Sequence, residues 1–145
     1  MQKDSINNRY FTSQESLNAI TKFNIFEKNE YFSLSPLALS KKDIKKKYYI
    51  DIVESFRNID LDSIICLKII PKDTKQNNFK ANVWINLNKF LFEKIELECS
   101  DCVSNPFEPI NKSDTIIKID YKITNSFIID KKVSKFNQIN FEYNV

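Results

Sequence analysis

Hydrophobic and polar residues alternate most clearly between residues 90 and 123. Early in this stretch, Leu97 and Cys99 belong to an apolar series that alternates with Lys and Glu, which is the two-residue period of a half-buried strand. The alternation returns over residues 117–123, where Ile and Tyr alternate with Lys and Asp. Cys102 lies in the corner between the two runs. The pattern therefore predicts a β-hairpin or β-arch with two thiols at its first corner.

Four further runs predict strands. Residues 63–70 form a nearly continuous apolar run that stops before a proline, which is typical of a buried strand. Residues 81–87 alternate cleanly, but Trp84 falls on their polar side, so Trp84 either packs under a helix or is exposed to solvent. Residues 139–145 alternate as a last strand, and residues 127–129 form another short one.

Two segments in the N-terminal half have helical features. Thr12 and Glu15 have the spacing of a capping box, which predicts a helix over residues 13–22. Residues 41–57 allow two interpretations. Apolar residues recur there every four positions, as in an amphipathic helix, yet the segment also alternates and is β-branched at residues 50–53, as a strand would be. Because of its length, we predict a helix over the whole segment.

The remaining N-terminal residues predict less regular structure. Residues 1–11 are polar and expected to be loose, and residues 23–26 look extended. Residues 31–39 alternate loosely around Pro36, which lacks a donor, so they predict an edge segment or a loop. The fold class that follows is α+β, mainly an antiparallel sheet of five or six strands with one or two helices in the N-terminal half. We predict a single domain over residues 1–145.

Glycine and histidine are both absent from the 145 residues. Without glycine there is no Walker loop and no dinucleotide fingerprint, because both need the backbone to approach phosphate closely. Without histidine there is no Ser-His-Asp or Cys-His nucleophile and no His-ligated metal site. No pair of carboxylates stands out as an acid–base dyad either. We therefore expect a protein that is not an enzyme, with no catalytic residues. The abundance of Ile, Lys and Asn points to an AT-rich genome.

Composition also limits the expected location. The 42% hydrophobic and 28% charged residues lie in the range of soluble globular proteins. No apolar run approaches the roughly 20 residues that span a bilayer, and no basic segment followed by an apolar one opens the chain. We expect a cytoplasmic protein, or one from the interior of an organelle, with no membrane partner.

Cys99 and Cys102 have the spacing of half a zinc site or of a redox dithiol. A zinc ion needs four ligands, and the only other thiol is Cys66. A thioredoxin-like pair opens a helix, whereas this pair ends a predicted strand. By spacing alone the structural interpretation is favoured, with Cys99 a small core residue and Cys102 a turn residue. We expect no metal and no cofactor.

Five lysines crowd into seven positions early in the chain. Residues 1–80 carry 14 Lys and Arg against 10 Asp and Glu, so the positive excess is N-terminal. If the segment is helical, these lysines present one positive face, which favours phosphate backbones. A run of lysines is more often a solvated helix surface, and only two arginines in the chain weaken any case for reading bases. The candidate RNA-binding residues are Lys41, Lys42, Lys45, Lys46 and Lys47.

The stretch from Leu97 to Cys102, followed by Pro106 and Phe107, resembles the YceD family, in which an alternating strand runs into Leu-x-Cys-x-x-Cys. The family is required for accumulation of large-subunit (23S) ribosomal RNA in bacteria and plastids. Asp101 stands where the family usually has a basic residue, and the spacing to Pro106 is longer.

The resemblance implies a non-enzymatic factor that binds pre-ribosomal RNA or a ribosome-assembly protein. The four residues that would carry the family motif are Cys99, Cys102, Pro106 and Phe107. The alternative is a β-rich interaction module that binds a protein partner through a sheet edge and has no nucleic-acid role.

Overall fold

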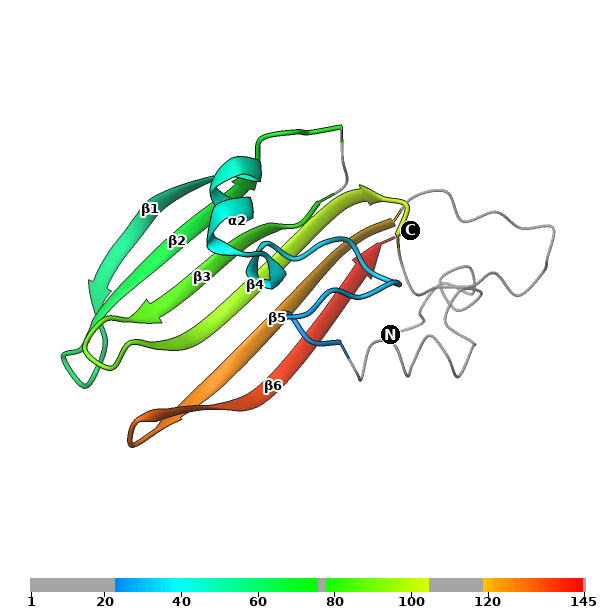
Figure 1. Cartoon of the computed structure of the whole chain (residues 1–145). Helices are drawn as coiled ribbons and strands as arrows, with labels where there is room; N and C mark the ends of the chain where they lie inside the picture. Colours follow the sequence, from blue (N-terminus) through cyan, green and yellow to red (C-terminus); the bar gives the residue numbers. More distant parts are fainter. Residues whose placement is uncertain (1–22, 76–77, 105–118, 145) are drawn as a thin grey trace.

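The computed structural model describes residues 23–75, 78–104 and 119–144, and it contains one six-stranded antiparallel sheet whose strands follow chain order (Figure 1). Within these residues there is one α-helix, α2 (Lys41–Lys47), preceded by a 3-10 helix (Pro36–Ala38). The predicted α+β fold with a mainly antiparallel sheet is confirmed. The strands are β1 (Tyr48–Arg57), β2 (Ser63–Pro71), β3 (Lys80–Asn86), β4 (Leu91–Cys102), β5 (Ile119–Asp130) and β6 (Val133–Asn144).

Some predicted features lie outside the described residues. They are the loose segment 1–11, the helix over residues 13–22, and the motif residues Pro106 and Phe107. The two alternating runs that flank the cysteine corner are confirmed as β4 and β5, which pair with each other in the antiparallel sense.

The predicted helix over residues 41–57 is wrong beyond Lys47. Tyr48–Arg57 form strand β1, which pairs with β2 along its length, with one irregularity between Ile52 and Glu54. The pairing with β2 decides between helix and strand, because it gives β1 a ladder of backbone hydrogen bonds on its inner side.

Other boundaries also differ from the predictions. The short run at residues 127–129 is part of β5, and the last strand begins at Val133 rather than at residue 139. Residues 23–26, predicted to be extended, include a turn in which the amide of Glu27 donates to the carbonyl of Asn24. The segment 31–39, predicted to be an edge segment or a loop, forms no strand but contains the short 3-10 helix Pro36–Ala38, so the prediction is wrong at these three residues.

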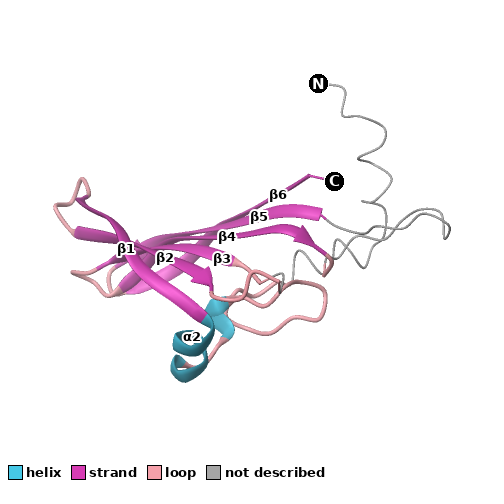
Figure 2. Ribbon diagram, turned by 90° about the horizontal axis from the view of Figure 1, so that it is seen from above, coloured by secondary structure: helices cyan, strands magenta, loops and turns pink. Residues whose placement is uncertain are grey.

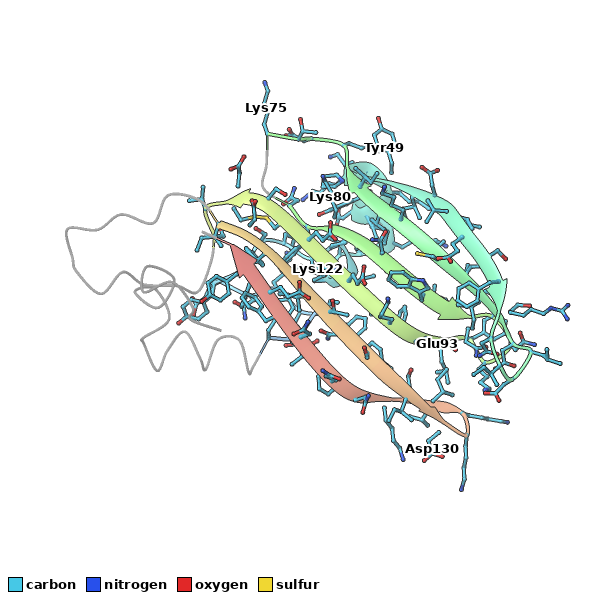
Figure 3. The ribbon with its side chains drawn as sticks, turned by 180° about the vertical axis from the view of Figure 1, so that it is seen from behind. Tyr49, Lys75, Lys80, Glu93, Lys122 and Asp130 are labelled. Atoms are coloured by element: carbon cyan, nitrogen blue, oxygen red, sulfur yellow. A yellow bond between two sulfur atoms is a disulfide. The ribbon has the colours of Figure 1, made fainter. Side chains whose placement is uncertain are left out.

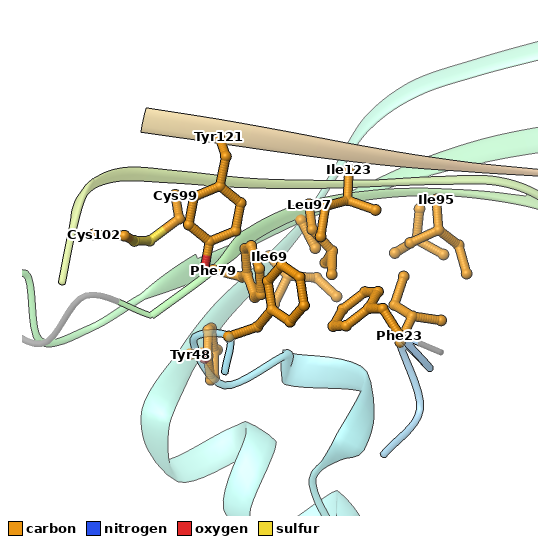
Figure 4. Close-up of a cluster of buried hydrophobic side chains, with 14 of the residues drawn as sticks. Phe23, Tyr48, Ile69, Phe79, Ile95, Leu97, Cys99, Cys102, Tyr121 and Ile123 are labelled. Atoms are coloured by element: carbon orange, nitrogen blue, oxygen red, sulfur yellow. A yellow bond between two sulfur atoms is a disulfide. The ribbon is translucent and has the colours of Figure 1, made fainter. Parts of the chain in front are cut away.

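The core lies on one face of the sheet, and the segment 23–47 covers that face (Figure 2). Apolar residues of neighbouring strands oppose one another there, for example Val83 with Ile95 and Leu97 with Ile123. Figure 4 shows Ile95, Leu97 and Ile123 with other buried side chains beneath the sheet. The buried hydrophobic residues of the core are Phe23, Ile25, Phe32, Tyr48, Ile69, Phe79, Ala81, Val83, Ile95, Leu97, Cys99, Cys102, Ile119, Tyr121 and Ile123.

The opposite face of the sheet carries mainly polar and charged side chains (Figure 3), together with the buried Ile64 and Cys66, which oppose Asn86 and Trp84. The ammonium of Lys94 and that of Lys122 both pair with the carboxylate of Glu96, at 3.2 and 3.6 Å. Trp84 is half-buried on this face, and the ammonium of Lys94 lies 3.9 Å from its ring centroid. Trp84 is therefore neither under a helix nor freely exposed, because a lysine side chain covers it.

The connections are made without glycine. In the described part of the chain, four residues of other types adopt a positive φ, which costs about 1–2 kcal/mol each because the Cβ crowds the following carbonyl. Three of them lie in the hairpin connections, and the fourth, Asp101, lies in an irregularity near the end of β4. The amide of Asp101 is held there by a 2.7 Å hydrogen bond to the carboxylate of Asp120. The three hairpin residues are Leu61, Phe90 and Lys131.

Candidate functional site

Helix α2 is short but well defined at its start. The hydroxyl of Ser40 accepts a hydrogen bond from the amide of Asp43 (3.2 Å) and donates one to its carboxylate (2.7 Å). An acidic residue in the first turn and lysines in the last turn both suit the helix dipole. Ile44 is the one residue of the helix that is not exposed, and it packs against the core. The helix is thus fixed by one side and open on the others.

All five lysines of α2 are exposed. None of them forms an ion pair within the described part of the chain, whereas Lys89, Lys94, Lys122 and Lys135 each pair with a carboxylate. The carboxylate of Asp43, which is the acidic group on the helix, is engaged by Ser40. The helix therefore presents five positive charges that the described residues leave uncompensated.

Lys72 extends this surface, and the sequence did not single it out. Its ammonium donates to the carbonyl of Lys45 (2.9 Å) and lies 5.1 Å from the ring centroid of the exposed Tyr49. Its amide donates to the carbonyl of Lys47 (2.9 Å). Its position in the chain was the one clue to this placement. Lys72 follows Pro71, the last residue of β2, and Pro71 pairs with Tyr48, the residue that follows the lysines of α2. We call the resulting surface the lysine patch; it consists of Lys41, Lys42, Lys45, Lys46, Lys47 and Lys72.

The cysteine corner lies inside the core rather than at the surface. Cys99 and Cys102 form a disulfide, with their Cα atoms 5.9 Å apart, and both side chains are buried. The description of Cys99 as a small core residue is confirmed. The description of Cys102 as a turn residue is wrong, because the irregularity in β4 between the two cysteines points both side chains inward.

The disulfide lies beside the segment that leads to α2. The hydroxyl oxygen of Ser33 is 3.4 Å from each sulfur, and the amide of Ser33 donates to the hydroxyl of Tyr121 (3.2 Å). Tyr121 donates in turn to the carbonyl of Ser104 (3.0 Å). Burial raises the pKa of Tyr121, so this hydroxyl keeps its proton and can donate. The corner therefore anchors the N-terminal segment on the sheet.

Cys66 takes no part in the cysteine corner. It opposes Trp84 in the register of β2 and β3, and it is the free cysteine among the described residues. Burial raises the pKa of its thiol, which disfavours the reactive thiolate. Across residues 23–75, 78–104 and 119–144, no cluster of three or more His, Cys, Asp or Glu side chains could hold a metal ion.

Comparisons with family models, with curated proteins and with solved structures find no match for this chain. In the part of the chain that the structure describes, no helix is long and apolar enough to cross a membrane.

Proposed function

We propose that the protein is a non-enzymatic RNA-binding factor that acts in the accumulation of large-subunit ribosomal RNA, and that the lysine patch is its contact surface for RNA. One observation carries the proposal. The five lysines of α2 are exposed together on one short helix, with no ion pair among the described residues. The resemblance to the YceD family supports the ribosomal part.

Lysine-rich surfaces bind phosphate groups rather than bases. A lysine ammonium is a compact point charge, and each phosphate that it neutralises releases a condensed counterion. The chain has only two arginines, so bidentate recognition of guanine contributes little. Tyr49 is exposed at the border of the patch, where its ring is available to stack on an unpaired base. The patch thus suits single-stranded or irregular RNA with weak sequence preference.

The test is the salt dependence of RNA binding. The full chain is titrated against a labelled single-stranded RNA of about 20 nucleotides, and affinity is measured by fluorescence anisotropy at several salt concentrations. Changing Lys41, Lys42, Lys45, Lys46 and Lys47 to Gln removes up to five phosphate contacts. We expect the slope of log affinity against log salt to fall by up to about 3.5, since each contact with a single strand contributes about 0.7.

A matched control separates the patch from overall charge. Changing Lys28, Lys68, Lys80, Lys131 and Lys132 to Gln takes the formal net charge from +3 to −2, as the first variant does. These lysines are exposed and lie outside the patch. We expect the control variant to keep most of the affinity and slope. Equal losses in both variants, or binding that does not depend on salt, would contradict the proposal.

The ribosomal part has its own test. Wild-type protein should co-sediment with large-subunit precursor particles, and the variant of the five α2 lysines should not. RNA binding in solution without co-sedimentation would leave the patch as an RNA surface and rule out the ribosomal role.

A further inference from the structure

Strand β1 is an unusual edge strand. It lies at one edge of the sheet and is exposed at nine of its ten residues. Edge strands of soluble proteins are normally protected by charge or by cover, because their free backbone groups can pair with another strand. The opposite edge, β6, has two exposed large hydrophobic residues among its described side chains, Val133 and Phe136. The exposed large hydrophobic residues of β1 are Tyr49, Ile50, Ile52, Val53 and Phe56.

The two faces of β1 differ in chemistry. Ile50 opposes Ile69 on the core face of the sheet. The N-terminal segment covers this face as far as Tyr48, which is 2% exposed, but not beyond it, since Ile50 is 42% and Ile52 is 65% exposed. On the other face, Asp51 opposes Lys68 and Glu54 opposes Cys66 in the register. Neither carboxylate forms an ion pair within the described residues. The edge therefore offers aliphatic side chains on one face and, on the other, two carboxylates that form no ion pair among the described residues, one of them opposite Lys68.

We propose that β1 docks an extended segment of another protein, which adds to the sheet as a seventh strand. The segment alternates aliphatic and basic residues. Its aliphatic side chains lie beside Ile50 and Ile52, and its Lys or Arg side chains face Asp51 and Glu54. Main-chain hydrogen bonds provide affinity in such strand addition, and the side-chain pairs across the new junction provide selectivity. This inference does not depend on the RNA-binding proposal.

A second copy of the chain fits this edge less well than a basic strand does. In the antiparallel register that places Tyr49 of one copy opposite Phe56 of the other, Asp51 falls opposite Glu54. Like charges directly opposite each other destabilise a strand pair. In that register, the carboxylates that attract a basic strand therefore discourage dimerisation through β1.

The test uses the full chain and two labelled peptides of about eight residues, one alternating Lys with Ile and the other alternating Glu with Ile. At physiological salt we expect the basic peptide to bind at least about tenfold more tightly than the acidic one. Hydrogen exchange measured by mass spectrometry should show slower amide exchange in β1 when the basic peptide is bound, and unchanged exchange in β6.

Charge reversal makes the test specific. The variant D51K/E54K should prefer the acidic peptide, which shows that the edge is intact and that the two carboxylates set the preference. The matched variant E98K/E142K, which reverses two carboxylates on β4 and β6, should keep the preference of the wild type. Four results would overturn the proposal: equal binding of both peptides, protection outside β1, protection in the free chain of the β1 amides that point away from β2, or a wild-type dimer that the substitution Ile50→Lys dissociates.

Discussion

Tyr48 joins the lysine helix to the first strand. It is the C-cap residue of α2 and the first residue of β1, and only 2% of its surface is exposed to solvent. Its hydroxyl donates to the carbonyl of Leu34 at 3.5 Å, which is a long and weak hydrogen bond. Burial raises the pKa of Tyr48 to about 12, because the phenolate would lose its hydration. The position therefore tolerates a neutral ring and resists a charged one.

This burial predicts a loss of stability at alkaline pH. The pKa of Tyr48 is higher in the folded chain than the ordinary value of about 10 in the unfolded chain. The neutral side chain of Tyr48 therefore contributes fully to the free energy of unfolding below pH 10. As the pH rises from about 10 to about 12, the free energy of unfolding should fall by roughly 2 to 3 kcal/mol. Urea unfolding of the wild type and of Tyr48→Phe at several pH values measures it. The difference between the two free energies of unfolding should change across this window, and parallel curves would contradict the expectation.

Helix α2 has seven residues, fewer than a helix needs to be stable by itself, so its cap and its contact with the core hold it together. The hydroxyl of Ser40 supplies that cap. Because the cap satisfies backbone groups of the helix alone, its loss should act locally and leave the sheet in place.

Ser40→Ala tests this local role. Loss of an N-cap costs about 0.5–2 kcal/mol, which corresponds to roughly 2- to 30-fold faster amide exchange in α2. Exchange in β3 and β4 should not change, and Ser55→Ala on the exposed strand β1 is the control. An equal acceleration in the central strands would show that the cap stabilises the whole fold instead.

The strands that the sequence predicted correctly are those with an unambiguous apolar pattern. Residues 81–87 alternate cleanly, and residues 63–70 form a nearly continuous apolar run, because both segments belong to central strands with buried side chains. Residues 48–57 form an edge strand that is mostly exposed, so burial does not require apolar residues at every second position, and apolar residues also recur at every fourth position. Their pairing with β2 makes them a strand, and this pairing cannot be predicted from the pattern of residues 48–57 alone.

In the candidate site too, residues that are adjacent in sequence could be predicted, whereas those that only the fold brings together could not. The five lysines of α2 are adjacent in sequence, so the pattern found them. Lys72 joins them because the start of β1 pairs with the end of β2. Ser33 reaches Cys99 and Cys102 from 66 and 69 positions away, a contact that depends on how the N-terminal segment crosses the sheet. The inward direction of Cys102 follows from the positive φ of Asp101, a backbone feature that sequence spacing does not reveal.

At the scale of the whole molecule, a single sheet becomes stable by being covered on one face. The segment 23–47 supplies that cover, and Phe32 lies near its centre. The ring of Phe32 is 4.7 Å from that of Phe23, 5.8 Å from Tyr121 and 6.0 Å from Phe141, measured between centroids. The same segment carries α2, so the packing of Phe32 supports both the sheet and the placement of the lysine patch.

Phe32→Ala measures how much of the stability this cover provides. Removing a buried phenylalanine side chain costs about 3–5 kcal/mol, which is a large part of the roughly 5–15 kcal/mol that a domain has. Urea unfolding should therefore show a much lower midpoint for Phe32→Ala. Phe136→Ala, which removes a ring that is 58% exposed on β6, should change the free energy of unfolding by less than about 1 kcal/mol. Similar small effects in both variants would mean that the sheet is stable without its cover, and the N-terminal segment would then be free to move the lysine patch independently of the core.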